Sequence, residues 1–99
     1  MLIEKIGKSA MLEQTAEECV ELAHACLKLA RYYRAENKVY GKTEEELLDN
    51  LAEEMADVEI CTMEIMKDLE LYIEYLEQKD KKKERLKKRL EELDNADSD

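Results

Sequence analysis

The stretch EQTAEECVELAHACLKLAR, residues 13–31, decides the fold and raises the question of function. Its apolar residues recur at steps of three and four, which is the period of a helix packed along one face. The same stretch places three carboxylates within five residues, at Glu17, Glu18 and Glu21. Acidic residues on a helix usually face water, so the question is whether this group is a solvated surface or a binding site.

The composition favours an all-α protein. The chain has 99 residues, no proline, two glycines and neither Phe nor Trp. Strong helix formers dominate it, and the β-branched and aromatic runs that a sheet needs are missing. A chain of this size buries a modest core. We therefore expect an antiparallel helical bundle of three main helices in one domain, residues 1–94, with a four-helix core completed by homo-oligomerisation and an acidic flexible tail at 95–99.

The first helix is expected over about residues 9–36, with Ser9 as a plausible N-cap. The stretch NKVYGK, residues 37–42, is the one clear break. Thr43 and Glu46 then form a capping box that starts the second helix.

The third helix is expected over about residues 71–94. It has almost nothing to bury between residues 77 and 85, which predicts a segment that is exposed or that reaches over a neighbour. No Gly or Pro separates it from the second helix, so by propensity alone the two could form one long helix.

Each helix has an apolar stripe at helical spacing that predicts its packed face. The stripes comprise Leu12, Ala16, Cys19, Val20, Ala23, Cys26, Leu27, Ala30 and Tyr33 in the first helix, Leu48, Leu51, Met55, Val58, Thr62, Ile65 and Leu69 in the second, and Tyr72, Leu76, Leu86, Leu90 and Leu93 in the third.

Charge is distributed unevenly. Residues 79–90 carry a net charge of +6, residues 1–78 carry −11 and residues 91–99 carry −5, which together give the chain its −10. An acidic body argues against a nucleic acid polymer as partner, because duplex binding depends on neutralising phosphates. The basic block, mixed with Glu and Leu at helical spacing, is typical of a charged helix face.

The three cysteines, Cys19, Cys26 and Cys61, are odd in number and lack CxxC spacing. This favours reduced, buried thiols in a cytoplasmic protein over disulfides or a metal site. No apolar run is long enough to span a membrane, and the first residues, MLIEKIGKSAMLEQ, do not have the form of a signal peptide. We expect no membrane partner.

Two acid pairs interrupt apolar columns. Glu18 and Glu21 share a helix face, as do Glu54 and Asp57 in NLAEEMADVEI. Met11 and Ala25 align with Glu18, and Leu47 and Cys61 align with Glu54, at intervals of seven residues. Half-buried carboxylates need partners, because desolvating a charge costs several kcal/mol. Two helices that each offer an acid pair can bind a divalent cation, and oxygen ligands favour Mg²⁺, with Mn²⁺ possible, over Zn²⁺.

Polar residues continue the line of Glu21. Gln14 and Lys28 each lie seven residues from it. Lys28, or Arg31 one turn further, is a candidate for contact with a phosphate that the metal also holds.

Three other interpretations stay open at this point. In a chain this rich in charge, ExxE and ExxD spacings also arise on a solvated helix face, and Glu17 stands off the line of the other acids. The spacing Glu21-x-x-His24 is that of di-iron carboxylate bundles, although the chain has one such pair and a homodimer would have to supply the second. A helical interaction or regulatory protein without catalytic activity is the third.

The order EECVEL, Lys28, a loop and NLAEEMADVEI resembles the all-α NTP pyrophosphohydrolase superfamily, the MazG-like and dimeric dUTPase-like proteins. Their signature is EExxE on one helix and ExxD on the next. The basic residues Lys82, Arg85 and Arg89, followed by Leu90, look like the basic helix of phage and Firmicute members. The resemblance covers about residues 7–90.

The resemblance implies a Mg²⁺-dependent enzyme that hydrolyses a nucleoside triphosphate to the monophosphate and pyrophosphate, and that forms a homodimer or tetramer. It implies three sets of site residues. They are Glu18, Glu21, Glu54 and Asp57 for the metal, Glu17, Glu18 and Glu21 for catalysis, and Gln14, Lys28, Arg31, Lys82 and Arg85 for the substrate.

Overall fold

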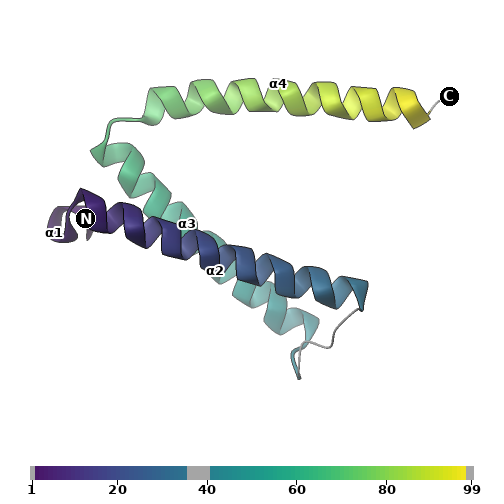
Figure 1. Ribbon diagram of the computed structural model, residues 1–99, viewed down its shortest axis with the longest axis horizontal. Helices are drawn as coiled ribbons and strands as arrows, with labels where there is room; N and C mark the ends of the chain where they lie inside the picture. Colours follow the sequence, from purple (N-terminus) through teal and green to yellow (C-terminus); the bar gives the residue numbers. More distant parts are fainter. Residues whose placement is uncertain (1, 36–40, 98–99) are drawn as a thin grey trace.

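The computed structural model describes residues 2–35 and 41–97 (Figure 1). These residues form four helices, namely α1 (Leu2–Ile6), α2 (Lys8–Arg34), α3 (Glu44–Asp68) and α4 (Tyr72–Asp97). The prediction of an all-α protein is confirmed over this part of the chain, with one short helix, α1, more than the sequence indicates. None of these helices is both long enough and apolar enough to cross a lipid bilayer.

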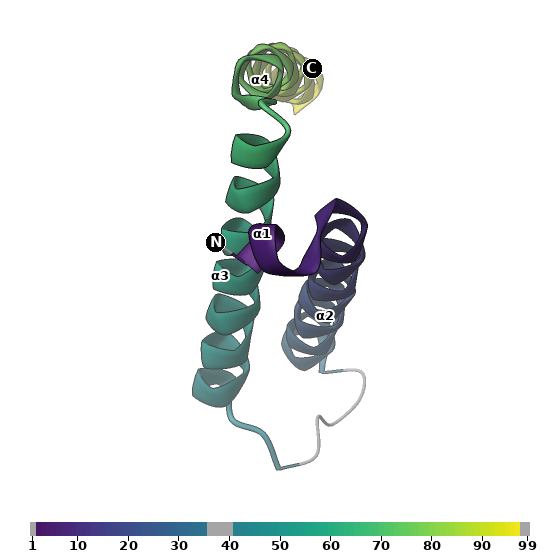
Figure 2. The ribbon, with the colours of Figure 1, turned by 90° about the vertical axis from the view of Figure 1, so that its left-hand side faces the viewer.

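Helices α2 and α3 form an antiparallel hairpin that contains the core (Figures 1 and 2). Met11 of α2 is completely buried and packs in one cluster with Ile3 of α1 and Cys61 of α3. The buried line continues along α2 through Ala25 and Leu29. The hairpin is therefore held together along one seam, closed at one end by α1.

Helix α1 changes the start of α2. Ser9 is not the N-cap, because α2 begins at Lys8 and its N-cap is Gly7, whose side chain offers nothing to cap with. Gly7 has a φ of 91°, a value that favours glycine, and it turns the chain from α1 into α2. The backbone N–H of Leu2 donates to Oε1 of Glu64 at 2.8 Å, which ties α1 to α3.

Most of the predicted apolar stripes are exposed in the single chain. The expectation that Cys19 and Cys26 are buried is wrong here, whereas Cys61 is buried as expected. Val20 is 53% exposed and Met55 is 54% exposed. The reason is that α2 is apolar over more than half of its circumference, and only the part that contains Met11, Ala25 and Leu29 faces α3. The five apolar positions predicted for α4, Tyr72, Leu76, Leu86, Leu90 and Leu93, are all exposed.

Several of the exposed apolar residues of the hairpin lie on one side of it. Met11 and Leu47 are buried, and the residues that follow them, Leu12 and Leu48, are 48% and 42% exposed. A step of one residue turns about 100° round a helix. Because α2 and α3 are antiparallel, the same turn in each leads to the same side of the hairpin.

The two sides of the hairpin therefore differ. The apolar side carries Leu12, Cys19, Cys26, Leu48, Met55 and Thr62, and the opposite, charged side carries Glu17, Glu21, Lys28, Glu53, Asp57 and Glu64.

A sharp elbow separates α3 from α4. Glu70 has a left-handed backbone conformation, with φ at 54°, and the N–H of Leu71 donates to the carbonyl oxygen of Met66 at 2.9 Å. The helix that propensity would continue is thus interrupted. Thr62 and Tyr75 are among the residues that line a hollow of about 350 Å³ inside the elbow, so α4 leaves on the apolar side of the hairpin. Beyond the elbow α4 diverges from the hairpin (Figures 1 and 2).

The remaining boundaries differ by a few residues from the predicted ones. Helix α4 continues through Asp97, so residues 95–97 of the expected flexible tail are helical. The predicted break NKVYGK falls mostly outside the described residues, and Gly41 within it has a φ of 65°.

The capping of α3 by Thr43 is confirmed, because its side-chain oxygen accepts from the N–H of Glu46 at 3.1 Å. Replacing Thr43 by Ala should lower the free energy of unfolding by about 1 kcal/mol, since that N–H loses its acceptor. Thr43→Ser keeps the hydroxyl and should stay close to wild type in a urea titration. Equal losses in both variants would contradict the capping role.

The elbow predicts a stabilising substitution. Glu70→Gly should raise the free energy of unfolding by up to about 1 kcal/mol, because glycine adopts a left-handed conformation without the steric cost that a Cβ imposes. Glu70→Ala removes the same carboxylate but keeps the Cβ, so it controls for charge. If Glu70→Ala stabilises the protein as much as Glu70→Gly in urea denaturation, backbone strain is not the cause.

Candidate metal centre

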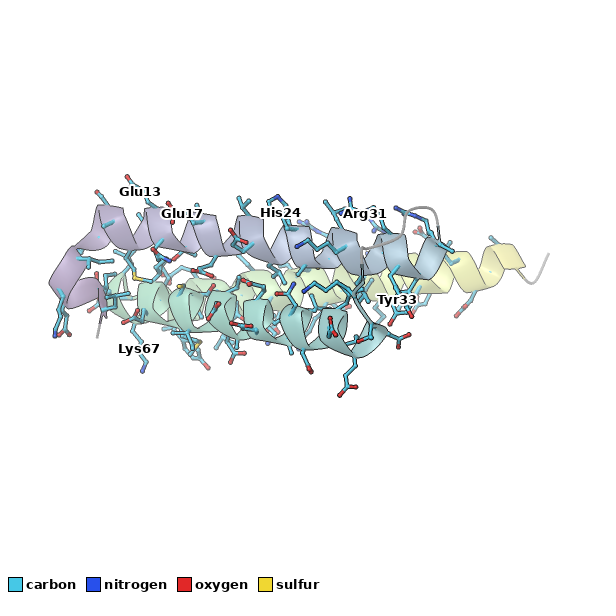
Figure 3. All side chains as sticks on the ribbon, turned by 90° about the horizontal axis from the view of Figure 1, so that it is seen from below. Glu13, Glu17, His24, Arg31, Tyr33 and Lys67 are labelled. Atoms are coloured by element: carbon cyan, nitrogen blue, oxygen red, sulfur yellow. The ribbon has the colours of Figure 1, made fainter. Side chains whose placement is uncertain are left out.

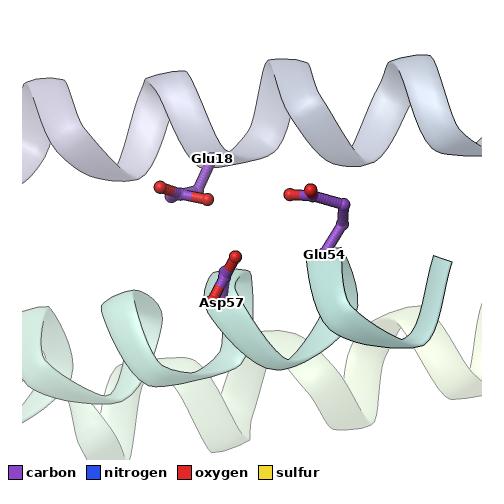
Figure 4. Close-up of side chains that lie close together, drawn as sticks. All are labelled: Glu18, Glu54 and Asp57. Carbon is purple, nitrogen blue, oxygen red and sulfur yellow. The ribbon is translucent and has the colours of Figure 1, made fainter. Parts of the chain in front are cut away.

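Three carboxylates converge between α2 and α3. Glu18 points from α2 towards α3, and Glu54 and Asp57 point back from α3 (Figure 4). Each offers one oxygen, and these oxygens all lie within 4.8 Å of one another. All three side chains are half-buried. The cluster thus lies in the seam of the hairpin and borders its charged side.

The heptad spacing of the buried columns puts the acids there. Glu18 lies seven residues from both Met11 and Ala25, and those two residues are 0% and 2% exposed. Glu54 has the same relation to Leu47 and Cys61, which are buried on α3. Residues seven apart nearly align on a helix, so each carboxylate takes one place in a column of core side chains.

Negative charge accumulates around Glu54. Desolvation raises the pKa of Glu54 above its ordinary value, and the negative charges of Asp57, Glu18 and Glu21 raise it further. On the other helix, Nε2 of Gln14 donates to Oε1 of Glu18 at 2.8 Å and holds that carboxylate in place. A cation in the seam would relieve this repulsion.

The buried Cys61 thiol stays protonated beside the acids. Burial raises its pKa, and the negative charge of Glu18 raises it further, although a hydrogen bond with Thr15 acts in the opposite direction. A protonated thiol is a poor metal ligand. Cys61 therefore serves the core, as the sequence predicts.

The donor set fits a hard divalent cation. Mg²⁺ prefers oxygen ligands at about 2.0–2.1 Å, so that ligand oxygens around it lie roughly 2.9–4.2 Å apart. The three oxygens, within 4.8 Å of one another, would have to move only slightly closer to reach this range. Mg²⁺ also keeps several waters, so three carboxylates are a sufficient protein contribution.

The other acids of the EExxE motif lie outside this group. Glu21 is exposed, yet it is near enough to Glu54 to raise the pKa of that carboxyl. Glu17 and His24 lie on α2 outside the seam, and Glu17 belongs to the charged side of the hairpin (Figure 3). Of the four acids expected to hold the metal, the structure therefore brings three together and leaves Glu21 beside them. The Glu21-x-x-His24 pair does not point into the seam.

The candidate substrate residues are spread over the molecule. Gln14 contacts Glu18, and Lys28 lies two turns beyond Glu21 on the same face of α2. Arg31 is half-buried and lies on α2 outside the seam, as His24 does (Figure 3). Lys82 and Arg85 line a shallow hollow on α4, well past the elbow. In Figure 3, which looks at the molecule from below, the hairpin lies in front of α4.

Two further acids continue the same edge of α3 and were not singled out from the sequence. Glu64, seven residues after Asp57, accepts the N–H of Leu2. Asp68 has an oxygen, Oδ2, that is buried and has no hydrogen-bond partner within the described part of the chain. The heptad step from Asp57 to Glu64 is the signal that could have identified the first of them.

Comparisons of the chain with models of known protein families, with curated proteins and with solved structures give no match. The residues of the seam therefore carry the functional assignment.

The raised pKa of Glu54 predicts how stability depends on pH. Because the folded protein binds the proton of this carboxyl more tightly than the unfolded chain does, ionised Glu54 destabilises the fold above its folded pKa. Glu54→Gln should therefore melt at a higher temperature than wild type at about pH 7, in the absence of metal. That advantage should disappear as the pH falls below the ordinary value of 4.5.

Glu13→Gln is the matched control, because Glu13 points away from α3 (Figure 3). It should leave the melting temperature unchanged at both pH values. If Glu54→Gln still melts above wild type in acid, or if Glu13→Gln melts above wild type as well, the stabilisation does not come from removing the charge of Glu54.

Proposed function

We propose that this protein is a Mg²⁺-dependent nucleoside triphosphate pyrophosphohydrolase. The observation that supports this most directly is the convergence of Glu18, Glu54 and Asp57 from two helices in one half-buried seam. Their spacing is that of the EExxE and ExxD motifs. A solvated helix face would not need Glu18 and Glu54 to take core positions in two packed columns.

Glu18, Glu54 and Asp57 hold the metal in this proposal. When bound, Mg²⁺ neutralises phosphate charge and orients the triphosphate. Gln14 is a positioning residue, because its hydrogen bond fixes the Glu18 carboxylate. Because Gln14 lies beside the seam, it is also a candidate for contact with the sugar or base of the nucleotide.

The reaction is attack of water on the α-phosphorus. A bond forms between the water oxygen and phosphorus, the bond from phosphorus to the oxygen bridging the α and β phosphates breaks, and pyrophosphate leaves. A carboxylate must orient the water and accept its proton. Glu21 suits this role best among the remaining acids, because it is exposed and lies beside Glu54 without joining the converging group. Glu17 suits it less, because it lies outside the seam and is not among the charges that raise the pKa of Glu54 (Figure 3).

Basic side chains supply the remaining phosphate contacts. Lys28 lies on the same face of α2 as Glu21, and Arg31 lies one turn further along the helix. Lys82 and Arg85 approach the phosphates only if α4 of another subunit brings them, because α4 of the same chain lies on the apolar side of the hairpin.

A second copy of the chain completes the core in this proposal. Leu12, Val20 and Leu27 of α2 and Leu48 and Met55 of α3 are exposed. Fully burying a side chain of this size contributes about 1.5–3 kcal/mol. Packing the apolar sides of two hairpins together gives the four-helix core of a homodimer, and two such dimers would give a tetramer.

Pyrophosphate release from a panel of ribo- and deoxynucleoside triphosphates, with Mg²⁺ or Mn²⁺, tests the proposal. At least one nucleotide should be hydrolysed to its monophosphate, and chelation of the metal should abolish the reaction. Glu54→Gln should lower kcat/KM by more than about a hundredfold. Loss of a residue that only hydrogen-bonds to a metal ligand costs up to about a hundredfold, and loss of the ligand itself should cost more.

Glu53→Gln is the control for that variant, because it changes the neighbouring exposed glutamate and should retain most of the activity. The proposal fails if no nucleotide is turned over and Mg²⁺ leaves the melting temperature unchanged. A non-catalytic interaction protein would then be the remaining interpretation.

A further inference from the structure

Three open hollows follow one another along α4 from the elbow outwards, and neighbouring hollows share residues. Tyr75 and Gln78 belong to the first two, and Lys82 and Leu86 belong to the last two. The residues that line these hollows on α4 define its inner face.

The inner face of α4 changes character along its length. At the elbow it is apolar, with Leu71 and Tyr75 beside Ile65 of α3. Further out it becomes basic, where Lys82, Arg85 and Arg89 line the last hollow with Leu86. The whole block from 79 to 90 carries a net charge of +6.

Within one chain this basic segment lies on the wrong side of the hairpin to meet the acidic residues. The hollow that Thr62 shares with α4 lies on the apolar side of the hairpin. Glu17, Glu21 and Asp57 belong to the charged side. The apolar side itself has exposed leucines and methionine to cover. The chain therefore offers a partner two surfaces, one apolar and one acidic.

We propose that the hairpin of a second copy occupies the space between α4 and the hairpin of the first. Its apolar side packs on the apolar side of the first hairpin, and its charged side then faces the inner face of α4. Lys82, Arg85 and Arg89 of one chain thus lie over the acids of the other, and two-fold symmetry makes the contact twice. This arrangement rests on the homo-oligomer of the proposed function and adds that α4 crosses to the partner.

The elbow permits such a crossing. Among the described residues, α4 has close backbone neighbours in α3 and in no other helix, so contacts near the elbow set its direction. Leu90 and Leu93, near its far end, are 53% and 56% exposed. A partner hairpin gives these side chains a surface to cover.

An anionic lipid surface is a poorer occupant for α4. Glu77, Glu84 and Glu91 form a column at intervals of seven residues. This column lies about 160° round the helix from Lys82 and Arg89. A uniformly negative membrane would repel the acidic column of α4. A protein partner with both apolar and acidic surface suits such a helix better.

A charge exchange between two variants tests the crossing without nucleotide or metal. Lys82→Glu/Arg89→Glu and Glu17→Lys/Glu21→Lys should each raise the dissociation constant of the homodimer by about tenfold or more in sedimentation experiments, because like charges then face each other. An equimolar mixture should regain the affinity of wild type as a heterodimer, in which both crossings again pair opposite charges. Recovery on mixing also shows that each variant folds.

Lys81→Glu/Lys88→Glu is the matched control, because each lysine precedes an inner-face residue and lies about 100° away from it. It should change the dissociation constant far less. A wild-type monomer, variants no weaker than this control, failure of the mixture to recover, or a monomer that binds phosphatidylserine vesicles through Lys82 and Arg89 would each overturn the inference.

The same measurements separate this inference from the proposed function. A monomer that hydrolyses nucleotide would contradict the crossing alone. A dimer that recovers on mixing but turns over no nucleotide would contradict the enzymatic function alone.

Discussion

The structure depends on one seam, where α2 packs on α3 and where core and carboxylates share the same columns. Met11, Ala25 and Cys61 bury their side chains along it. Glu18 and Glu54 occupy the places between them. Each half-buried carboxylate is partly desolvated and repels the others, which opposes the packing of its neighbours. The seam is therefore less stable than an all-apolar one would be, and such local conflicts are expected at functional sites.

The seam could be predicted from the sequence because its residues repeat every seven positions. The alignment of Met11 with Glu18, and of Leu47 with Glu54, fixes which acids enter the seam without knowledge of the fold. Spacing alone does not show whether Glu21 enters the seam. It lies 60° from Glu18, and this rotation is enough to leave it exposed beside the cluster. Helical spacing thus predicts which side of each helix the converging acids occupy, but it does not distinguish an acid inside the seam from one at its edge.

Other parts of the fold could not be predicted, for identifiable physical reasons. The apolar arc of α2 is so wide that periodicity does not show which part of it meets α3, and the stripe through Leu12 and Val20 is exposed as a result. The elbow has no sequence signal either, because Glu70 is neither Gly nor Asn. Its left-handed conformation accompanies the contact from Leu71 back to Met66. Helix α1 is short, and Gly7 alone separates it from α2.

The charge asymmetry of the chain connects the seam with α4. The acids that repel one another around Glu54 make the charged side of the hairpin attractive to a basic helix, but α4 of the same chain emerges on the opposite side. In the proposed dimer, a second copy turned over onto the apolar side would cover both surfaces at once. It would cover the leucines that a single chain leaves exposed, and it would bring Lys82 and Arg85 to the acids of the charged side. The negative charge that weakens the seam in one chain would thus strengthen the association of two.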